Sequence, residues 1–168
     1  MNRSIVSIAL TATLLAAPAA LAAPSKADRS FADTAARAGL AEVAEAQIAL
    51  QKSQRQDVRD FAQHMVDDHG RANDQLKQAA AAEQITLPTS PSSRDQQQAK
   101  KLQGLSGAAF DKQYIEDQRA AHREAVSLFT KESKSGTDPQ LKQFAATTLP
   151  TLENHYQSIR SMSLTARK

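Results

Sequence analysis

Three histidines occupy positions where a helix would normally carry an apolar residue. His69, His122 and His155 each continue a run of apolar residues with steps of three and four, which is the periodicity of the buried face of a helix. The fourth histidine, His64, falls outside this pattern. Imidazoles that face one another in a protein interior can share a metal ion. The spacing therefore predicts one inward cluster formed by three separate helices.

An acidic side chain would complete such a site, and Glu45 is the best placed because it interrupts an apolar stripe. Asp68, which precedes His69, and Met65, one helical turn earlier, are secondary candidates. We predict a site for Zn, Cu or Fe formed by the three histidines and Glu45. Because protonated imidazole cannot ligate, the metal affinity of such a site would fall as the pH drops below about 6.5.

The same residues have a simpler interpretation that stays open. Hydrogen bonds alone can hold a buried imidazole. Glu45 is equally compatible with the flank of its helix, and Met65 with ordinary core packing. The distances between the imidazoles distinguish the two interpretations, since ring nitrogens more than about 8 Å apart could not share one ion.

Four long helices are expected to position these residues. Apolar periodicity and capping residues predict them over 30–53, 57–83, 106–135 and from Pro139 onward. A short polar helix is expected over 93–103, after the proline-containing loop 87–92. Two short connections and one long central crossover predict an all-α four-helix bundle with a short extra helix in the crossover. Pro150 predicts a kink in the last helix, which either fits the curvature of the bundle or aims His155.

The composition agrees with a helical domain and excludes several kinds of site. The 168 residues include only five Gly and six Pro, too few for a β-protein with many tight turns. The absence of Cys excludes thiolate metal ligands and a thiol nucleophile. The formal net charge of +3 is spread along the chain, which argues against a nucleic-acid partner.

The beginning of the chain has the pattern of a signal peptide. A short basic start is followed by an apolar run over 4–15 and by a small-residue cleavage site between Ala22 and Ala23. Cleavage there would give a periplasmic or secreted protein, and no later segment is apolar enough to span a membrane. The expected organisation is a signal peptide over 1–22, a mobile lead-in over 23–29, the bundle over 30–163 and a tail over 164–168.

Four segments of the chain resemble one family of exported proteins. They are residues 40–45, 61–69, 107–114 with His122, and 144–155. Together they are similar to the exported DUF family 4142, over a range from Phe31 to Ile159. The resemblance implies a ferritin-like helical bundle and no assigned activity. Catalytic ferritin-like proteins use Glu-x-x-His motifs, whereas the residues three positions before these histidines are Val66, Arg119 and Leu152.

Three functional hypotheses follow from these observations. The first is an exported bundle protein that binds a metal ion or another ligand in its core, without catalytic residues. The second is a structural or stress-protective envelope protein whose histidines only form hydrogen bonds. The least favoured is a metal-dependent oxidoreductase, because the chain lacks bridging carboxylates, a His-Glu-x-x-His motif and a glycine-rich phosphate loop.

Overall fold

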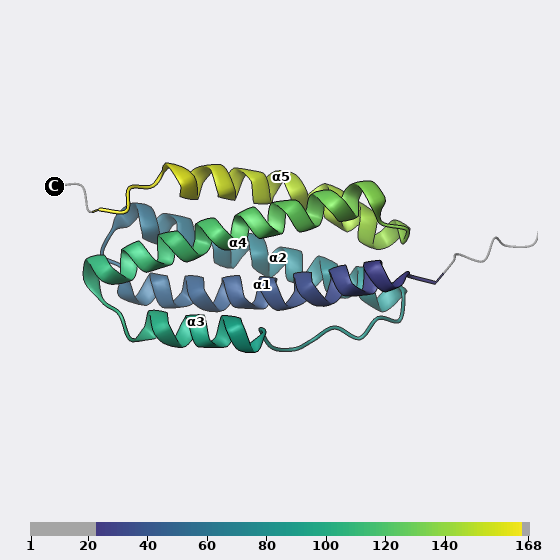
Figure 1. The fold of residues 1–168 in the computed structure, drawn as a ribbon, viewed down its shortest axis with the longest axis horizontal. Coiled ribbons are helices and arrows are strands. Elements are labelled where there is room, and N and C mark those ends of the chain that lie inside the picture. Colours follow the sequence, from purple (N-terminus) through teal and green to yellow (C-terminus); the bar gives the residue numbers. More distant parts are fainter. Residues whose placement is uncertain (1–22, 166–168) are drawn as a thin grey trace, which may run out of the picture.

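The computed structural model describes residues 23–165, which form five helices and no strand. The helices are α1 (Lys26–Lys52), α2 (Gln56–Ala82), α3 (Ser93–Gln103), α4 (Gly107–Ser135) and α5 (Pro139–Ser161). The pair α1 and α2 forms one hairpin, α4 and α5 form a second, and α3 lies against α1 in the connection (Figure 1). The predicted all-α four-helix bundle with a short helix in its crossover is confirmed.

The long crossover determines the direction of the second hairpin. It leaves the end of α2, and α3 then returns along α1 to the opposite end of the bundle, where α4 begins (Figure 1). As a result α2 and α4 run in the same direction, and each long helix is antiparallel to both of its neighbours. One long crossover between two hairpins is the connectivity of ferritin-like bundles.

The first helix begins earlier than the sequence suggested. Ser25 and Asp28 form a capping box, in which Ser25 Oγ accepts from the Asp28 amide at 3.2 Å and Asp28 Oδ2 accepts from the Ser25 amide at 2.7 Å. Asp28 is fully buried and also accepts hydrogen bonds from the backbone and hydroxyl of Thr137, between α4 and α5. The prediction of a mobile lead-in is therefore wrong for residues 26–29, which belong to the bundle.

The N-cap of α2 lies two residues earlier than predicted. The sequence favours Asp57 as the N-cap, but this position is occupied by Arg55, whose side chain makes no capping hydrogen bond. The Asp57 carboxylate instead accepts from the Arg55 guanidinium at 2.7 Å and from the Val58 amide at 3.0 Å. The predicted signal peptide over 1–22 and the last three residues of the predicted tail lie outside the described residues.

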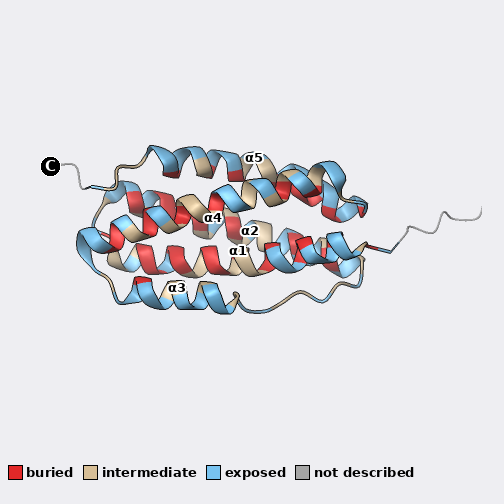
Figure 2. Cartoon of the chain, in the orientation of Figure 1, coloured by how far each residue is buried: buried red, intermediate tan, exposed pale blue. Residues whose placement is uncertain are grey.

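Apolar residues of the helices meet in two separate core clusters. One contains Phe61, Phe110 and Tyr114, and the other contains Phe31, Phe129 and Phe144. The buried residues of each helix face the interior, while the outward faces are exposed (Figure 2). Within residues 23–165, none of the helices combines the length and apolar character needed to cross a bilayer.

A polar layer separates the two clusters. On each of the four long helices, one or two buried polar residues lie between residues of the first cluster and residues of the second. They are Glu42 and Glu45 on α1, His69 on α2, Gln118 and His122 on α4, and His155 on α5. The antiparallel arrangement brings Glu42 and the three histidines to the same level of the bundle.

The last helix continues through Pro150, which lies on its exposed face. The carbonyl that loses its hydrogen bond belongs to Ala146, which is also exposed. The apolar stripe of α5 therefore passes from Thr148 to Leu152 without including the proline.

Candidate metal centre

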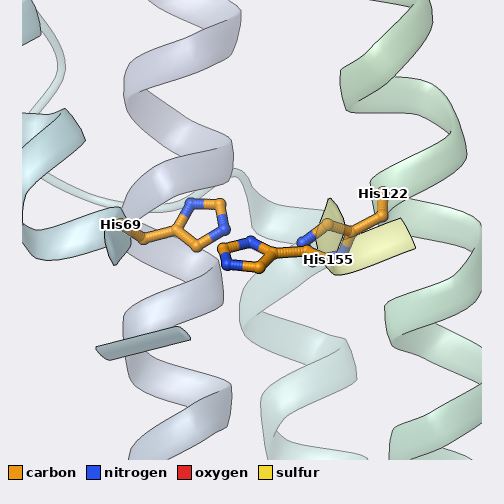
Figure 3. A group of neighbouring side chains, drawn as sticks. All are labelled: His69, His122 and His155. Atoms are coloured by element: carbon orange, nitrogen blue, oxygen red, sulfur yellow. The ribbon is translucent and has the colours of Figure 1, made fainter. Parts of the chain in front are cut away.

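The three predicted histidines meet in the interior of the bundle and their rings point toward one another (Figure 3). The ring centroids of His69 lie 5.6 Å from those of both His122 and His155, and the latter two are 5.5 Å apart. One nitrogen from each ring lies within 4.8 Å of the other two. The predicted inward cluster is confirmed, and His64 is exposed as expected.

Hydrogen bonds define which nitrogen of two rings carries the proton. His122 Nδ1 lies 3.0 Å from the backbone carbonyl of Gln118, which can only accept, so Nδ1 donates. His155 Nε2 lies 2.8 Å from Asp68 Oδ2, and the carboxylate oxygen as the acceptor makes Nε2 the donor. The opposite nitrogens, His122 Nε2 and His155 Nδ1, then carry lone pairs.

Each imidazole leaves one buried nitrogen without a hydrogen-bond partner among the described residues. These atoms are His69 Nε2, His122 Nε2 and His155 Nδ1. Burying a nitrogen without a hydrogen-bond partner costs free energy. One bound cation could provide a partner for all three nitrogens of these neighbouring rings. Asp68 behind His155 and the Gln118 carbonyl behind His122 match the supporting hydrogen bonds found behind metal-bound histidines.

Burial keeps the imidazoles in the form that can ligate. It lowers the pKa of His122 to about 4, against a smaller opposing effect of the Gln118 carbonyl. Burial and the other two imidazoles place the pKa of His69 well below its usual value. The pKa of His155 is also lowered by burial, although Asp68 partly opposes this. All three rings are therefore neutral at pH 7.

The acidic neighbour of the cluster is not the one that the sequence suggested. The two Glu45 oxygens accept from Gln98 at 3.2 Å and Gln118 at 3.3 Å. The carboxylates that contact imidazoles are Asp68 and Glu42, whose Oε1 lies 3.9 Å from His122 Nδ1. The prediction of Glu45 as the neighbouring carboxylate is therefore wrong, because Glu45 lies one turn of α1 beyond the histidine layer.

The secondary candidates have different surroundings. Asp68 contacts the cluster through His155 and also pairs with Arg71. Met65 is fully buried within the apolar cluster that contains Phe61. Asp68 therefore orients His155, while Met65 fills the core.

The sequence did not indicate Glu42 as a neighbour of the histidines because the buried face of α1 on which it lies consists of small residues. Its buried neighbours along α1 recur at steps of three and four, and they are Ala32, Ala35, Gly39, Ala46 and Ala49. Alanine and glycine contribute little to a hydrophobic pattern, so this face does not stand out by hydropathy. The small residues mark the face of α1 that packs closely against α2, where a Cβ on Gly39 would lie 2.0 Å from Asn73 Oδ1. If small residues had been counted as core-facing, the sequence would have predicted an inward Glu42.

The two buried glutamates hold their protons near neutral pH. Burial raises the pKa of Glu42 to about 7, although the Gln118 side chain opposes the shift. Burial, together with Glu42 and Asp117, raises the pKa of Glu45 to about 8. Glu42 and Glu45 therefore contribute little negative charge below pH 7, and the carboxylate hydrogen-bonded to the cluster is that of Asp68.

The donor set differs from that of a di-iron centre. The group of potential ligands within 4.8 Å of one another consists of three imidazoles and, among residues 23–165, includes no carboxylate. An ion held at about 2.0–2.1 Å from each nitrogen requires nitrogens roughly 3.3–3.5 Å apart, so the rings would have to close by about 1.5 Å at most. With such a movement the three residues could hold one ion.

Two solved structures share this fold. The crystal structure of a DUF305 fragment from Deinococcus radiodurans matches with a TM-score of 0.71 and 14% identity, over 82% of this chain and 95% of that one. CopM in the Cu(I)-bound form matches with a TM-score of 0.65 and 16% identity, over 79% of this chain and 92% of that one. At these identities the likeness shows the fold alone.

Sequence comparison gives one family match. Residues 13–162 match the family described as a domain of unknown function, DUF4142. No curated protein matches the chain in sequence. The match covers most of the chain and includes all five helices.

Proposed function

The chain belongs to the DUF4142 family, and we propose that it binds a single transition-metal ion through His69, His122 and His155. The observation that carries the proposal is the set of three buried nitrogens without partners on neighbouring neutral rings. A purely structural histidine would be expected to satisfy both nitrogens by hydrogen bonds. A metal ion would satisfy all three nitrogens at once.

Among the metals that imidazole accepts, the site favours copper. Among divalent ions, Cu²⁺ stands above Zn²⁺ and Fe²⁺ in intrinsic affinity for nitrogen ligands. Three neutral donors leave the full charge of the ion in a buried site, and the cost of burial rises with that charge. Cu(I) therefore has an advantage over Zn²⁺ and Fe²⁺. CopM, which shares the bundle fold, is described in a Cu(I)-bound form, in agreement with this choice.

Metal binding should raise the melting temperature of the protein. Because the cluster exists only in the folded chain, an ion at 100 times its dissociation constant would stabilise that state by about 2.7 kcal/mol. We expect the largest rise with Cu(I) under anaerobic conditions and a smaller one with Zn²⁺. Differential scanning fluorimetry of untagged protein measures the effect.

Single histidine variants test the ligand assignment. Replacing any one of His69, His122 or His155 with Gln should abolish the metal-dependent rise, while the exposed His64→Gln should retain it. Met65→Leu, which preserves the core volume, should also retain it. If the wild-type melting temperature does not respond to Cu(I), Cu²⁺ or Zn²⁺, the three histidines have a structural role and the proposal is wrong.

The affinity should persist to lower pH than the sequence suggested. Protons compete with the metal only near the lowered pKa values of the buried rings, about 4 for His122, and not near 6.5. Between pH 7.5 and pH 5.5 we expect the dissociation constant to rise by less than the roughly tenfold that each ordinary imidazole would cost. Protonation of Glu42, whose pKa is about 7, contributes to the small change.

Isothermal titration calorimetry at the two pH values checks this expectation, with a competing chelator of known pH dependence. His64, an exposed imidazole near His155, is removed in the control variant His64→Gln, which should show the same small change. A loss of a hundredfold or more at pH 5.5 would mean that the rings titrate as exposed imidazoles do.

A further inference from the structure

A cavity of about 170 Å³ extends from the histidine layer to exposed residues of α1 and α4, and residues of all five helices line it. His69 and His155 line its inner end, and the exposed residues Thr34 and Glu124 also line it. The cavity is large enough for several water molecules. It therefore links the buried cluster to solvent.

Small side chains on two neighbouring helices leave this space open. Ala38 and Ala41 line the cavity from α1, and Ala121 and Ala125 line it from α4. Each pair lies three or four residues apart and thus on one face of its helix. Four larger apolar residues at these positions would close the space between the helices.

The acidic side chains that line the cavity are Glu42, Glu45, Asp68, Asp95 and Glu124, and among residues 23–165 neither Lys nor Arg lines it. Because Glu42 and Glu45 hold protons near neutral pH, the attraction of a cation rests on Asp68, Asp95 and Glu124. The chain as a whole has 21 basic and 18 acidic residues, so a cavity of average composition would contain both signs. A hollow with charges of one sign and walls of low dielectric constant concentrates ions of the opposite sign.

Unpartnered atoms at the inner end also indicate a cation. Glu42 Oε2 and His69 Nε2 are buried without hydrogen-bond partners, and both residues line the cavity. Glu42 and His69 are 6% and 7% exposed, respectively. Both unpartnered atoms can accept a hydrogen bond from a hydrated cation or ligate the ion directly.

We propose that this cavity is the route by which the metal cation reaches and leaves the histidine cluster. The inference rests on the proposed function. Asp95 and Glu124 attract the hydrated ion at the outer part, and Glu45 and Glu42 replace its water ligands on the way inward. The ion then passes to the imidazoles, which bind it without an anionic ligand.

A second hollow offers the competing route. It lies between α2 and α5 and is lined by His64, Asn154 and Ser158, with Asp68 and His155 at its base. Asp68 is its only carboxylate, and that group already pairs with Arg71 and His155. Of the three cluster histidines, only His155 lines this hollow. The cavity between α1 and α4 is therefore the better route for a cation.

The rates of metal uptake and release test the proposal. Cu²⁺ association is followed in a stopped-flow instrument by quenching of tyrosine fluorescence, which is available because Tyr114 lies in the core and the chain has no Trp. Release is followed after mixing with excess EDTA. Ala38→Leu, which narrows the cavity, should lower both rates by the same factor and leave the dissociation constant unchanged, because that constant is the ratio of the two rates.

A charge variant provides an independent measurement at solvent-accessible positions. Asp95→Asn combined with Glu124→Gln should lower the association rate by about three- to tenfold at low ionic strength and weaken its salt dependence. The matched controls are Asp60→Asn with Glu116→Gln, which changes the net charge equally, and Ala109→Leu on the exposed side of α4. Both controls should keep the wild-type rates.

The outcomes separate this proposal from the proposed function. If the wild-type protein takes up no metal, the proposed function is wrong. If it binds metal and both the narrowed and the charge variants keep the control rates, the route is wrong while the function stands. If Asn154→Leu slows uptake and release instead, the hollow between α2 and α5 is the route.

Discussion

Replacing Phe61 with alanine is expected to lower the free energy of unfolding by about 3–5 kcal/mol. The ring is 3% exposed and packs edge-on against three neighbours, with its centroid 6.4 Å from Tyr114, 6.0 Å from His122 and 6.2 Å from His155. Its removal would leave a cavity between the apolar cluster and the histidine layer. Urea denaturation monitored by circular dichroism measures the change.

The control is a residue two positions away on the same helix. Gln63 is exposed, so Gln63→Ala should alter the free energy of unfolding by no more than about 0.5 kcal/mol. The other core cluster offers a second pair, Phe144→Ala against the exposed Lys142→Ala, with the same expectation. Equal urea midpoints within either pair would contradict the assignment of its inward face.

Replacing Glu45 with glutamine is expected to stabilise the protein at pH 8 by a few kcal/mol. The carboxyl group has a pKa of about 8 in the folded chain, against 4.5 ordinarily. Each pKa unit of difference between the folded and unfolded states corresponds to about 1.4 kcal/mol. Glutamine preserves an oxygen that can accept from Gln118 but carries no charge to bury.

The sign of the pH dependence follows from proton binding. Between pH 4.5 and pH 8 the folded chain retains the Glu45 proton while the unfolded chain releases it, so the stability contributed by this group falls as the pH rises. The difference between Glu45→Gln and wild type should therefore be small at pH 4.5 and largest at pH 8. Glu116→Gln, on the surface, should show no such trend. A constant difference at all pH values would mean that Glu45 is ionised throughout.

Local patterns in the sequence determine much of this molecule. The periodicity around His69, His122 and His155 placed each of them on an inward face because a helix repeats every 3.6 residues whatever surrounds it. The capping residue Asp138 followed by Pro139 marked the start of α5, which begins at Pro139 with Asp138 as its N-cap. The proline-containing loop marked the crossover. These features depend on neighbours in the chain.

Other features depend on residues that are distant in the sequence. The inward face of α1 consists largely of alanine and glycine, so the hydropathy of the sequence could not show which of Glu42 and Glu45 faces the histidines. The packing of α1 against α4 places Glu42 beside His122. The capping box at Ser25 was not recognised in the sequence, and it is held in place by Thr137 from the far end of the chain.

The sequence alone therefore determined that three imidazoles point inward. Their separation, the nitrogens that lack a partner, the pKa shifts and the acidic cavity were decided by the tertiary structure. All of these features depend on how closely different helices approach one another and on how far they exclude water. They are therefore defined only when the four long helices are packed together.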